Sequence, residues 1–301
     1  MGTPDFAVAS LDALVKAGCQ VVAVITAPDK PAGRGMQMQQ SAVKKYAAEH
    51  ALPVLQPEKL KNPGFLEQLK ALRADLQVVV AFRMLPEVVW SMPPMGTINL
   101  HGSLLPRYRG AAPINWAVIN GEKETGVTTF RLKQEIDTGN ILLQERFPVG
   151  ENETAGEVHD RMKETGAALL VKTVKGLAEG SIHDVPQAAP DKSDHPVPHA
   201  PKIFTETCRI DFTKTVDEVH NLVRGLSPFP AAFTELNGKT LKVYRTEKSY
   251  EVPVSPVIRY ETDHKTYLRF ACANGYVYIK ELQLEGKRKM NVEEFLRGYR
   301  F

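Results

Sequence analysis

Short runs of β-branched residues alternate with helical patterns through the first half of this 301-residue chain. Residues 20–25 (QVVAVI) and 77–82 (QVVVAF) are almost continuously apolar, as expected for strands covered on both faces of a parallel sheet. Between them, a helical pattern begins with Asn62 as N-cap and Pro63 as first helical residue. Further helices are expected over 41–50 and near 113–120, and further strands over 97–101, 125–132 and 140–147. This alternation predicts an α/β fold with an open, mostly parallel sheet.

The start of the chain departs from this pattern. Residues 2–6 (GTPDF) look like the turn after a first strand and lead into a helix, yet no strand precedes them. In a doubly wound sheet the first strand is usually central, so its absence would leave a gap in the ladder. We expect either that the recorded start is a few residues late or that the sheet is unusual.

A proline-rich segment separates this α/β region from a different pattern. Before it, Thr154 and Glu157 form a capping box for a long helix that Gly180 can end. Residues 186–202 then contain five prolines without apolar periodicity, which is typical of an extended linker. We therefore expect a first domain over 1–185 and a linker over 186–203.

The last third of the chain, 204–301, is expected to form a second domain. One helix with Thr215 as N-cap is followed only by strands, expected over 232–236, 240–245, 257–260, 267–271 and 275–281. The dipeptides Asn237-Gly238 and Asn274-Gly275 are turn signals between them. Short strands at this spacing favour a small OB-like β-barrel.

The charge is balanced overall but unevenly distributed. The chain carries 38 Lys and Arg against 35 Asp and Glu, a net charge of +3. Residues 1–202 hold 22 basic and 22 acidic side chains, so the whole surplus, 16 against 13, follows residue 202. This is a weak indication of a polyanionic partner for the second domain.

The composition excludes several classes of protein. With 43% hydrophobic and 24% charged residues, it is typical of a globular protein rather than a disordered or fibrous one. No apolar run approaches the ~20 residues that a membrane helix needs, and the N-terminus lacks a signal-peptide pattern. The three cysteines, Cys19, Cys208 and Cys272, lie far apart, which predicts reduced thiols and a cytoplasmic location.

Polar side chains gather at the end of the predicted strand 97–101. Asn99, His101 and Ser103 alternate along it, so they project to one face at the carboxyl end, where open α/β sheets bind ligands. An amide can stabilise an oxyanion, and an imidazole can transfer a proton near neutral pH. Asp137, in the loop 135–139 (EIDTG), gains meaning only beside His101, where it would orient the imidazole and move a proton. From the residues alone, polar groups that merely satisfy a turn remain the alternative.

Two basic segments are candidates for nucleic-acid contact. Lys30 and Arg34 lie in a glycine-containing loop, PDKPAGRG, that either reaches a nucleic-acid backbone or is a solvated surface loop. Lys287, Arg288 and Lys289 form a short cluster in the basic domain. Neither GxGxxG nor GxxxxGK[ST] occurs, so nicotinamide and P-loop chemistry lack their main support. The histidines indicate no metal site.

Several longer motifs resemble those of one family. Six segments are similar to motifs of the methionyl-tRNA formyltransferases. They are GTPDF, PDKPAGRG, INLHGSLLPRYRGAAPINWAVINGEKETGVTTF and IDTG, with RIDF and GLSPFPAAF towards the C-terminus. The NxHxSLLP motif with a distant DxG is typical of folate-dependent formyltransferases, and the PAGRG loop and second domain narrow the resemblance. It implies a Rossmann-like formyltransferase domain and an OB-like domain. It also implies formyl transfer from 10-formyltetrahydrofolate to the methionine of initiator methionyl-tRNA, for translation initiation.

The resemblance also implies roles for single residues. Asn99, His101 and Asp137 would be catalytic, and Ser103, Leu104, Leu105 and Pro106 would line the folate site. The loop with Lys30 and Arg34 would approach the tRNA acceptor stem, and the domain with Lys287, Arg288 and Lys289 would hold the tRNA body. Where the family commonly has a Tyr-Gly pair, this chain reads Phe82-Arg83-Met84-Leu85-Pro86. That stretch is similar to one bordering the pterin in related purine-pathway enzymes, which makes Arg83, Met84 and Leu85 further folate candidates.

Other functions remain open at this point. A formyltransferase or hydrolase that also uses 10-formyltetrahydrofolate, with a ribonucleotide or amino-sugar substrate, would share the same centre. A non-catalytic OB-type RNA-binding protein would leave Asn99, His101 and Asp137 without a purpose. Nothing in the sequence demands a partner chain or a membrane, so we expect a monomer.

Overall fold

The computed structural model describes residues 1–32, 36–187, 197–253 and 260–301. These residues form two compact units, which we describe separately. The N-terminal unit comprises Met1–Arg109, Gly126–Arg146 and Asp160–Pro198. The C-terminal unit comprises Gly110–Thr125, Phe147–His159 and His199–Phe301, and so includes two segments that precede the proline-rich stretch.

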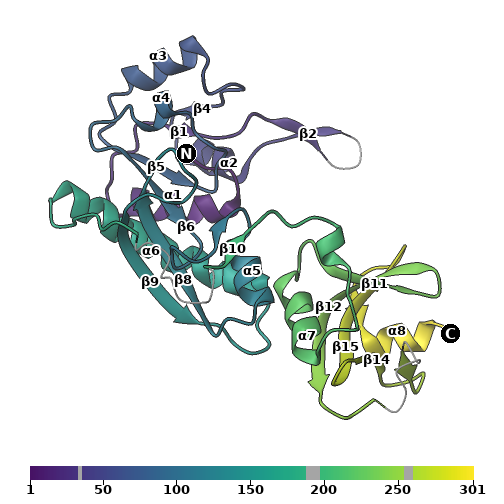
Figure 1. The fold of residues 1–301 in the computed structure, drawn as a ribbon. Coiled ribbons are helices and arrows are strands. Elements are labelled where there is room, and N and C mark those ends of the chain that lie inside the picture. Colours follow the sequence, from purple (N-terminus) through teal and green to yellow (C-terminus); the bar gives the residue numbers. More distant parts are fainter. Residues whose placement is uncertain (33–35, 188–196, 254–259) are drawn as a thin grey trace. The chain divides into compact units, whose positions relative to one another are not determined.

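A four-stranded sheet carries the N-terminal unit, in the order β5-β6-β8-β9 (Figure 1). Its strands are β5 (Gln77–Val80), β6 (Thr97–His101), β8 (Glu124–Arg131) and β9 (Ile141–Pro148). β5 runs parallel to β6, whereas β8 runs antiparallel to it. On β6, Ile98 and Leu100 are fully buried and Asn99 and His101 alternate with them, as the strand periodicity requires. The strand predicted over 97–101 is confirmed residue for residue.

A shorter parallel pair, β1 (Val24–Ile25) and β4 (Val54–Leu55), lies across a gap that the first two residues fill. Gly2 forms a parallel bridge with Val80, and its N–H donates to the carbonyl of Ile25. A Cβ on Gly2 would stand 2.5 Å from that of Ala7, so a side chain does not fit there. The ladder position expected for a first strand is therefore held by two residues. Only Val24 and Ile25 of the predicted strand 20–25 are strand residues, because β4 offers just two partners.

Helices lie beside these strands, and all of them except α4 are predicted by local signals in the sequence. The described helices of this unit are α1 (Asp5–Lys16), α2 (Ala42–Glu49), α3 (Pro63–Ala71) and α4 (Glu87–Trp90), together with most of α6 (Ala155–Ala178). The Asn62 side chain accepts a hydrogen bond from the N–H of Phe65, which confirms the predicted cap of α3. Thr154 and Glu157 form the capping box of α6, with the N–H of Thr154 donating to Glu157 Oε2 at 2.8 Å.

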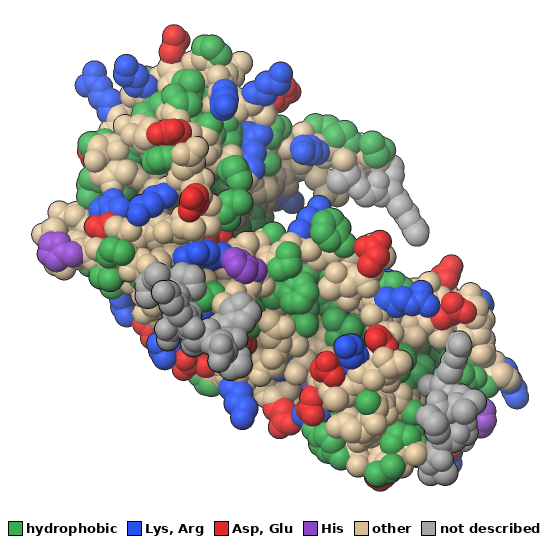
Figure 2. Space-filling model, in the orientation of Figure 1, with side chains coloured by type: hydrophobic (Ala, Val, Ile, Leu, Met, Phe, Trp, Pro, Cys, Tyr) green, Lys and Arg blue, Asp and Glu red, His purple; other side chains and the backbone are tan. Residues whose placement is uncertain are grey.

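A hairpin of β2 (Lys30–Ala32) and β3 (Gln37–Gln39) projects from the body of the N-terminal unit (Figure 1). Its methionines Met36 and Met38 are 69% and 64% exposed, and Figure 2 shows hydrophobic side chains along this arm. At its base, Asp29 accepts hydrogen bonds from Lys44 and from Gln56 Nε2. These two contacts fix where the arm leaves the unit.

The C-terminal unit is built on a six-stranded antiparallel sheet (Figure 1). Its order is β11-β12-β15-β14-β13, and β16 also pairs with β15. The strands are β11 (Ala232–Leu236), β12 (Lys239–Ser249), β13 (Glu261–Thr262), β14 (Leu268–Cys272), β15 (Gly275–Leu284) and β16 (Met290–Asn291). The predicted strand 257–260 lies outside the described residues except for Tyr260. Asn237 and Gly238 both adopt positive φ in the turn between β11 and β12, as predicted.

Helices pack beside this sheet and complete its core. The unit also holds β7 (Arg109–Gly110, of which only Gly110 belongs to this unit), α5 (Pro113–Ile119), β10 (His199–Ala200), η1 (Glu206–Cys208), α7 (Val216–Gly225) and α8 (Val292–Gly298). Thr215 and Glu218 form the capping box of α7, as the N-cap prediction requires. One continuous cluster of buried apolar residues joins α7, α8 and the strands. An antiparallel sheet with this single core confirms the predicted architecture of the second domain.

Candidate active site

The carboxyl end of β6 presents Asn99 and His101 on one face of the sheet. Asn99 lies between Val79 of β5 and Phe130 of β8, and His101 lies opposite Thr128 of β8. The position agrees with the general rule that open α/β sheets bind ligands beyond the carboxyl ends of their strands.

The imidazole of His101 is hydrogen-bonded through one nitrogen and faces a carboxylate with the other. Nε2 lies 2.9 Å from the backbone carbonyl of Tyr108, and because a carbonyl only accepts, Nε2 carries the hydrogen. Nδ1 then faces the Asp137 carboxylate, whose Oδ2 lies 3.8 Å away. The edge-on ring of Phe130, with centroids 6.4 Å apart, fixes the plane of the imidazole. His101 is only 7% exposed, so this orientation is maintained without help from solvent.

Asp137 reaches this position from an unusual backbone conformation. It has φ of +55°, in the left-handed region that side chains other than glycine rarely adopt. Two residues on, Gly139 presses against β8 so closely that a Cβ would stand 1.6 Å from the carbonyl oxygen of Arg131. The IDTG loop therefore needs its glycine, and Asp137, 9% exposed, is directed at His101 by the loop around it.

Asn99 contributes a buried polar atom without a partner. Its Oδ1 is buried and makes no hydrogen bond with the described residues. A buried oxygen that accepts no hydrogen bond costs free energy, so the structure keeps it only for a reason such as ligand binding. A bound substrate with an N–H or O–H group would supply the missing donor.

Of the next residues of the motif, two are buried and two are partly exposed. Ser103 is fully buried and its Oγ donates to the carbonyl of Arg107 at 2.6 Å, while Leu105 is 3% exposed. Leu104 and Pro106 are half-buried. Of the four residues predicted to line a folate site, Leu104 and Pro106 retain apolar surface for a ligand.

In the segment 82–86, where the chain differs from the common family pattern, some side chains make structural contacts and one is exposed. Arg83 donates to the backbone carbonyls of Pro57 and Glu58, so its guanidinium braces a neighbouring loop. Met84 is 72% exposed, whereas Leu85 is 9% exposed and belongs to an apolar core cluster. Met84 is therefore the member of this trio with a free apolar surface.

The predicted nucleic-acid residues lie on the surface where the structure describes them. Lys30 is exposed on β2, and Arg34 lies outside the described residues. Lys287, Arg288 and Lys289 are exposed in the turn between β15 and β16. Arg288 pairs with Glu294, and Lys289 pairs with Glu281 at 2.6 Å, so carboxylates offset part of this positive charge.

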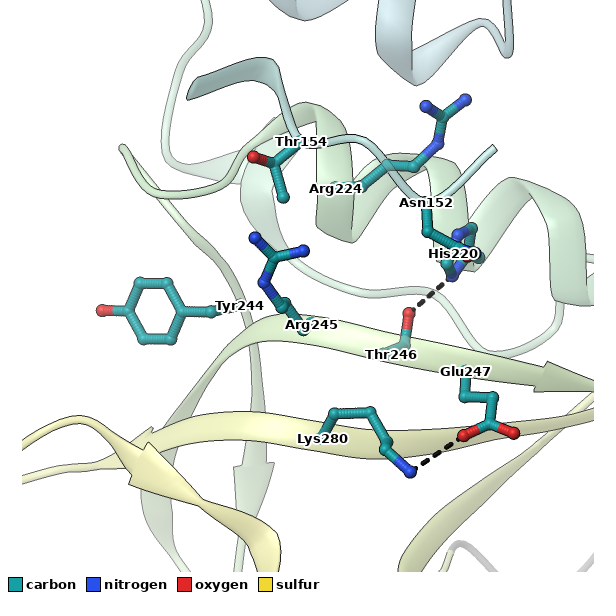
Figure 3. Close-up of a pocket in the computed structure, with 9 residues that line it drawn as sticks. All are labelled: Asn152, Thr154, His220, Arg224, Tyr244, Arg245, Thr246, Glu247 and Lys280. Atoms are coloured by element: carbon teal, nitrogen blue, oxygen red, sulfur yellow. Dashed lines mark hydrogen bonds and ion pairs between the residues drawn. The ribbon is translucent and has the colours of Figure 1, made fainter. Parts of the chain in front are cut away.

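A separate pocket of about 370 Å³ lies in the C-terminal unit beside β12 (Figure 3). None of the predicted site residues is among those that line it. Lys280 pairs with Glu247 and Arg245 with Glu157, whereas Arg224 donates to the backbone carbonyls of Gly150 and Glu153. Because none of the predicted site residues lines this pocket, the candidate centre remains the end of β6.

Sequence reasoning missed Tyr108, although its carbonyl sets the protonated nitrogen of His101. Tyr108 also has positive φ, +59°, and its N–H donates to the carbonyl of Pro198. Because the contribution is a backbone atom, the residue type gives no signal of it. Among the described residues there is no group of three or more His, Cys, Asp or Glu side chains that could hold a metal ion, and no helix long and apolar enough to cross a membrane.

Models of known protein families match most of this chain. The model of the formyl transferase family matches residues 1–174, and that of its C-terminal domain matches residues 202–300. A methionyl-tRNA formyltransferase of Parabacteroides distasonis is 55% identical, over 100% of this chain and 94% of the relative. This chain belongs to the methionyl-tRNA formyltransferase family. The resemblance read from its motifs is thereby confirmed.

Other members of the methionyl-tRNA formyltransferase family give the same result. The enzyme of Bacteroides thetaiotaomicron is 51% identical over 100% of this chain and 94% of its own length. Solved structures share the fold at lower identity. The sugar 3N-formyl transferase WlaRD, solved with dTDP and 5-N-formyl-THF, has a TM-score of 0.69 at 22% identity and covers 95% of this chain and 97% of its own. HypX from Aquifex aeolicus, in complex with tetrahydrofolic acid, has a TM-score of 0.59 at 20% identity, covering 83% and 44%.

Proposed function

We propose that this protein transfers the formyl group of 10-formyltetrahydrofolate to the α-amine of methionine on initiator methionyl-tRNA. The observation that carries the proposal is the juxtaposition of His101 and Asp137 at the end of β6 in a chain of this family. Because the tRNA substrate is aminoacylated and used in the cytoplasm, we assign the activity to that compartment. We expect the protein to act as a monomer.

The reaction needs a base for the amine proton, a group that stabilises the developing negative charge, and a proton for the N10 of the leaving folate. The neutral amine attacks the formyl carbon, its N–C bond forms, and negative charge develops on the formyl oxygen. Collapse breaks the bond to the folate N10, which takes a proton, while the amine loses one. Only groups that meet these charges as they develop accelerate such a step.

The geometry suggests how three side chains divide these tasks. Because Tyr108 occupies Nε2 of His101, the nitrogen left to meet substrate is Nδ1, on the side of Asp137. A proton held at Nδ1 and the Asn99 amide would stabilise the formyl oxygen. Asp137 would accept the proton of the attacking amine, directly or through water. Each such contribution is commonly worth about 10²–10³ in rate.

Apolar surface near this centre supports the folate part of the proposal. Leu104 and Pro106 keep partly exposed side chains beside β6, and Met84 is exposed on the loop after β5. Flat heteroaromatic ligands bind to surfaces of this kind, with a few polar groups fixing their orientation. We assign Leu104, Pro106 and Met84 to the donor site, with Ser103, Leu105, Arg83 and Leu85 as its structural support.

For the tRNA, we propose contacts from the β2–β3 arm with Lys30 and Arg34 and from Lys287, Arg288 and Lys289. Lysine and arginine side chains position a protein on phosphates without reading sequence. The paired state of Arg288 and Lys289 means that binding RNA would exchange carboxylate partners for phosphates.

A substrate panel tests the proposal. The purified protein is given 10-formyltetrahydrofolate with initiator methionyl-tRNA, glycinamide ribonucleotide or a dTDP-amino sugar in parallel, and the formylated product is identified by mass. We expect formyl-methionine on the tRNA and at least about a hundredfold less product from the two small substrates, since these would leave the RNA contacts unused. Formyl transfer to a small substrate with none to tRNA would refute the proposal. Release of formate alone would indicate a hydrolase.

A further inference from the structure

The side chain of Gln187 lies between the two loops that form the candidate centre. We propose that Gln187 is a positioning residue that holds Asp137 in line with His101. The inference rests on the proposed function, because it concerns the same centre. Gln187 belongs to the segment that the sequence indicates as a linker, and nothing in its residue type marks it.

The amide nitrogen of Gln187 donates hydrogen bonds to the loop that carries Asp137. Its Nε2 donates to the backbone carbonyl of Asp137 at 2.8 Å and to that of Gly139 at 2.8 Å. Both amide hydrogens are thereby used on one three-residue turn. Asp137 is in the left-handed backbone region, a conformation that persists only where neighbours determine it. Gln187 supplies two of those determining bonds.

The amide oxygen of Gln187 holds the other loop. Oε1 accepts from Arg109 Nε at 3.1 Å and from the Nη2 of the same guanidinium. Arg109 directly follows Tyr108, whose carbonyl accepts the hydrogen of His101 Nε2. One side chain therefore links the residue that orients the imidazole to the loop that carries the carboxylate. The ring of contacts closes at the 3.8 Å separation of His101 Nδ1 and Asp137 Oδ2.

The partners explain why an amide is needed here. Two carbonyls require donors and a guanidinium requires an acceptor, which also fixes the orientation of the amide without ambiguity. A glutamate at this position would keep the acceptor for Arg109 but would place an oxygen against both carbonyls. A leucine of similar size would lose all four bonds.

The segment around Gln187 is anchored without its side chain. Val185 pairs with Ile141 through two backbone hydrogen bonds of 2.7 and 2.8 Å. Asp184 accepts from Asn140 Nδ2 at 2.8 Å and lies 3.9 Å from Arg131 Nε. Since these contacts already fix the chain to β9, the Gln187 side chain is not required for that purpose. Asp184 thus offers a matched control on the same segment.

Steady-state kinetics with 10-formyltetrahydrofolate and initiator methionyl-tRNA give the first test. In Gln187→Leu and Gln187→Glu we expect kcat to fall by about 10- to 100-fold, because a displacement of about 1 Å costs up to that factor. KM for both substrates should stay within about threefold, since neither variant removes a substrate contact. Asp184→Ala should keep the wild-type kcat. Adding Gln187→Leu to Asp137→Asn should cost nothing further, because both act through one carboxylate.

The ¹⁵N resonances of the His101 imidazole give a second test that does not depend on the substrate. They are assigned by their loss in His101→Gln and report which nitrogen carries the proton. We expect them to move in Gln187→Leu and to stay in place in Asp184→Ala. Unchanged resonances in Gln187→Leu, or an equal movement in Asp184→Ala, would overturn the proposal. If the wild type fails to formylate tRNA, the proposed function is wrong, and these resonances still decide the role of Gln187.

Discussion

The candidate centre depends on how one imidazole uses each of its nitrogens. His101 donates its Nε2 hydrogen to the carbonyl of Tyr108 and turns Nδ1 towards Asp137, and the two residues are 7% and 9% exposed. The 3.8 Å between Nδ1 and Oδ2 is longer than a hydrogen bond, so Asp137 faces the imidazole without being hydrogen-bonded to it.

Replacing either Asp137 or His101 should slow the chemistry and spare donor binding. Asp137→Asn keeps the shape of the side chain but cannot accept a proton, so we expect kcat to fall by at least about 10²-fold. His101→Ala should lose a similar factor, and the Kd for the folate donor should change by less than about threefold in both. Steady-state kinetics and calorimetric titration of the donor measure the two effects. The exposed neighbour Glu135 is the control, since Glu135→Gln should behave as wild type. Near-normal kcat in Asp137→Asn would remove that residue from the mechanism.

His220 of the C-terminal unit should make stability depend on pH. It is 2% exposed, its Nδ1 lies 2.9 Å from Thr246 Oγ1, and burial lowers its pKa below the ordinary 6.5. The unfolded chain therefore takes up a proton at a pH where folded His220 does not. Stability is full above about pH 6.5 and falls as the pH drops towards the folded pKa.

Urea unfolding at pH 7.5 and 5.5 measures this dependence. In His220→Gln we expect the free energy of unfolding to fall less between the two pH values than in the wild type. His183, which is exposed, provides the control, and His183→Gln should reproduce the wild-type difference. An undiminished fall in His220→Gln would show that other groups account for the pH dependence.

The elements that could be predicted are those with local signals. Asn62 caps α3, Thr215 and Glu218 cap α7, and Thr154 and Glu157 cap α6, because each cap joins residues three apart in the sequence. The strand 97–101 and its polar face follow from alternation alone. Alternation is a local signal, and it suffices to place the Asn99 and His101 side chains on one face of the strand.

What could not be predicted rests on contacts between distant segments. The antiparallel direction of β8 and the ladder place of Gly2 depend on pairing across the fold, which periodicity does not encode. Tyr108 acts through a backbone atom, and Gln187 meets Asp137 from 50 residues away in the chain. Residues 21–23 are predicted as strand, but the structure has no strand there and the residues are half-buried. Their apolar side chains fit either a strand or a covered loop, which periodicity alone does not distinguish.

The capping box of α7 should contribute measurably to the C-terminal unit. Thr215 accepts from the N–H of Glu218, and the Glu218 carboxylate accepts from the N–H of Thr215 at 2.9 Å. Thr215→Ala should lower the free energy of unfolding by about 1 kcal/mol, the usual cost of a lost cap. Thr215→Ser retains the hydroxyl and should recover most of this. Equal stability of the alanine and serine variants, measured by urea unfolding, would contradict the cap's role.

At the scale of the whole molecule, the placement of charge matters more than its amount. The net charge of +3 lies entirely after residue 202. Several cations there, such as Arg288 and Lys289, have carboxylate partners within the protein. Affinity for a polyanion then depends on which cations can leave those partners, and it should weaken with added salt.

The basic turn between β15 and β16 should contribute to that salt dependence. Replacing Lys287, Arg288 and Lys289 together by alanine should reduce the slope of log Kd against log salt by about 1–2, since each phosphate contact contributes about 0.7–0.9. kcat at saturating tRNA should not change. Filter binding over a salt series measures the slope. Lys70→Ala with Lys172→Ala, both exposed in the N-terminal unit, is the control. Parallel lines for the triple variant and the wild type would exclude this turn from the tRNA site.

The most direct test of the account is a single-turnover transfer with excess enzyme. The protein, loaded with 10-formyltetrahydrofolate carrying a radiolabelled formyl group, is mixed with initiator methionyl-tRNA and quenched in acid at intervals. We predict that the label appears on the α-amine of methionine in the wild type and is delayed by at least about 10²-fold in Asp137→Asn. Label that stays on the folate, leaves as formate, or reaches methionine equally fast in Asp137→Asn would contradict it.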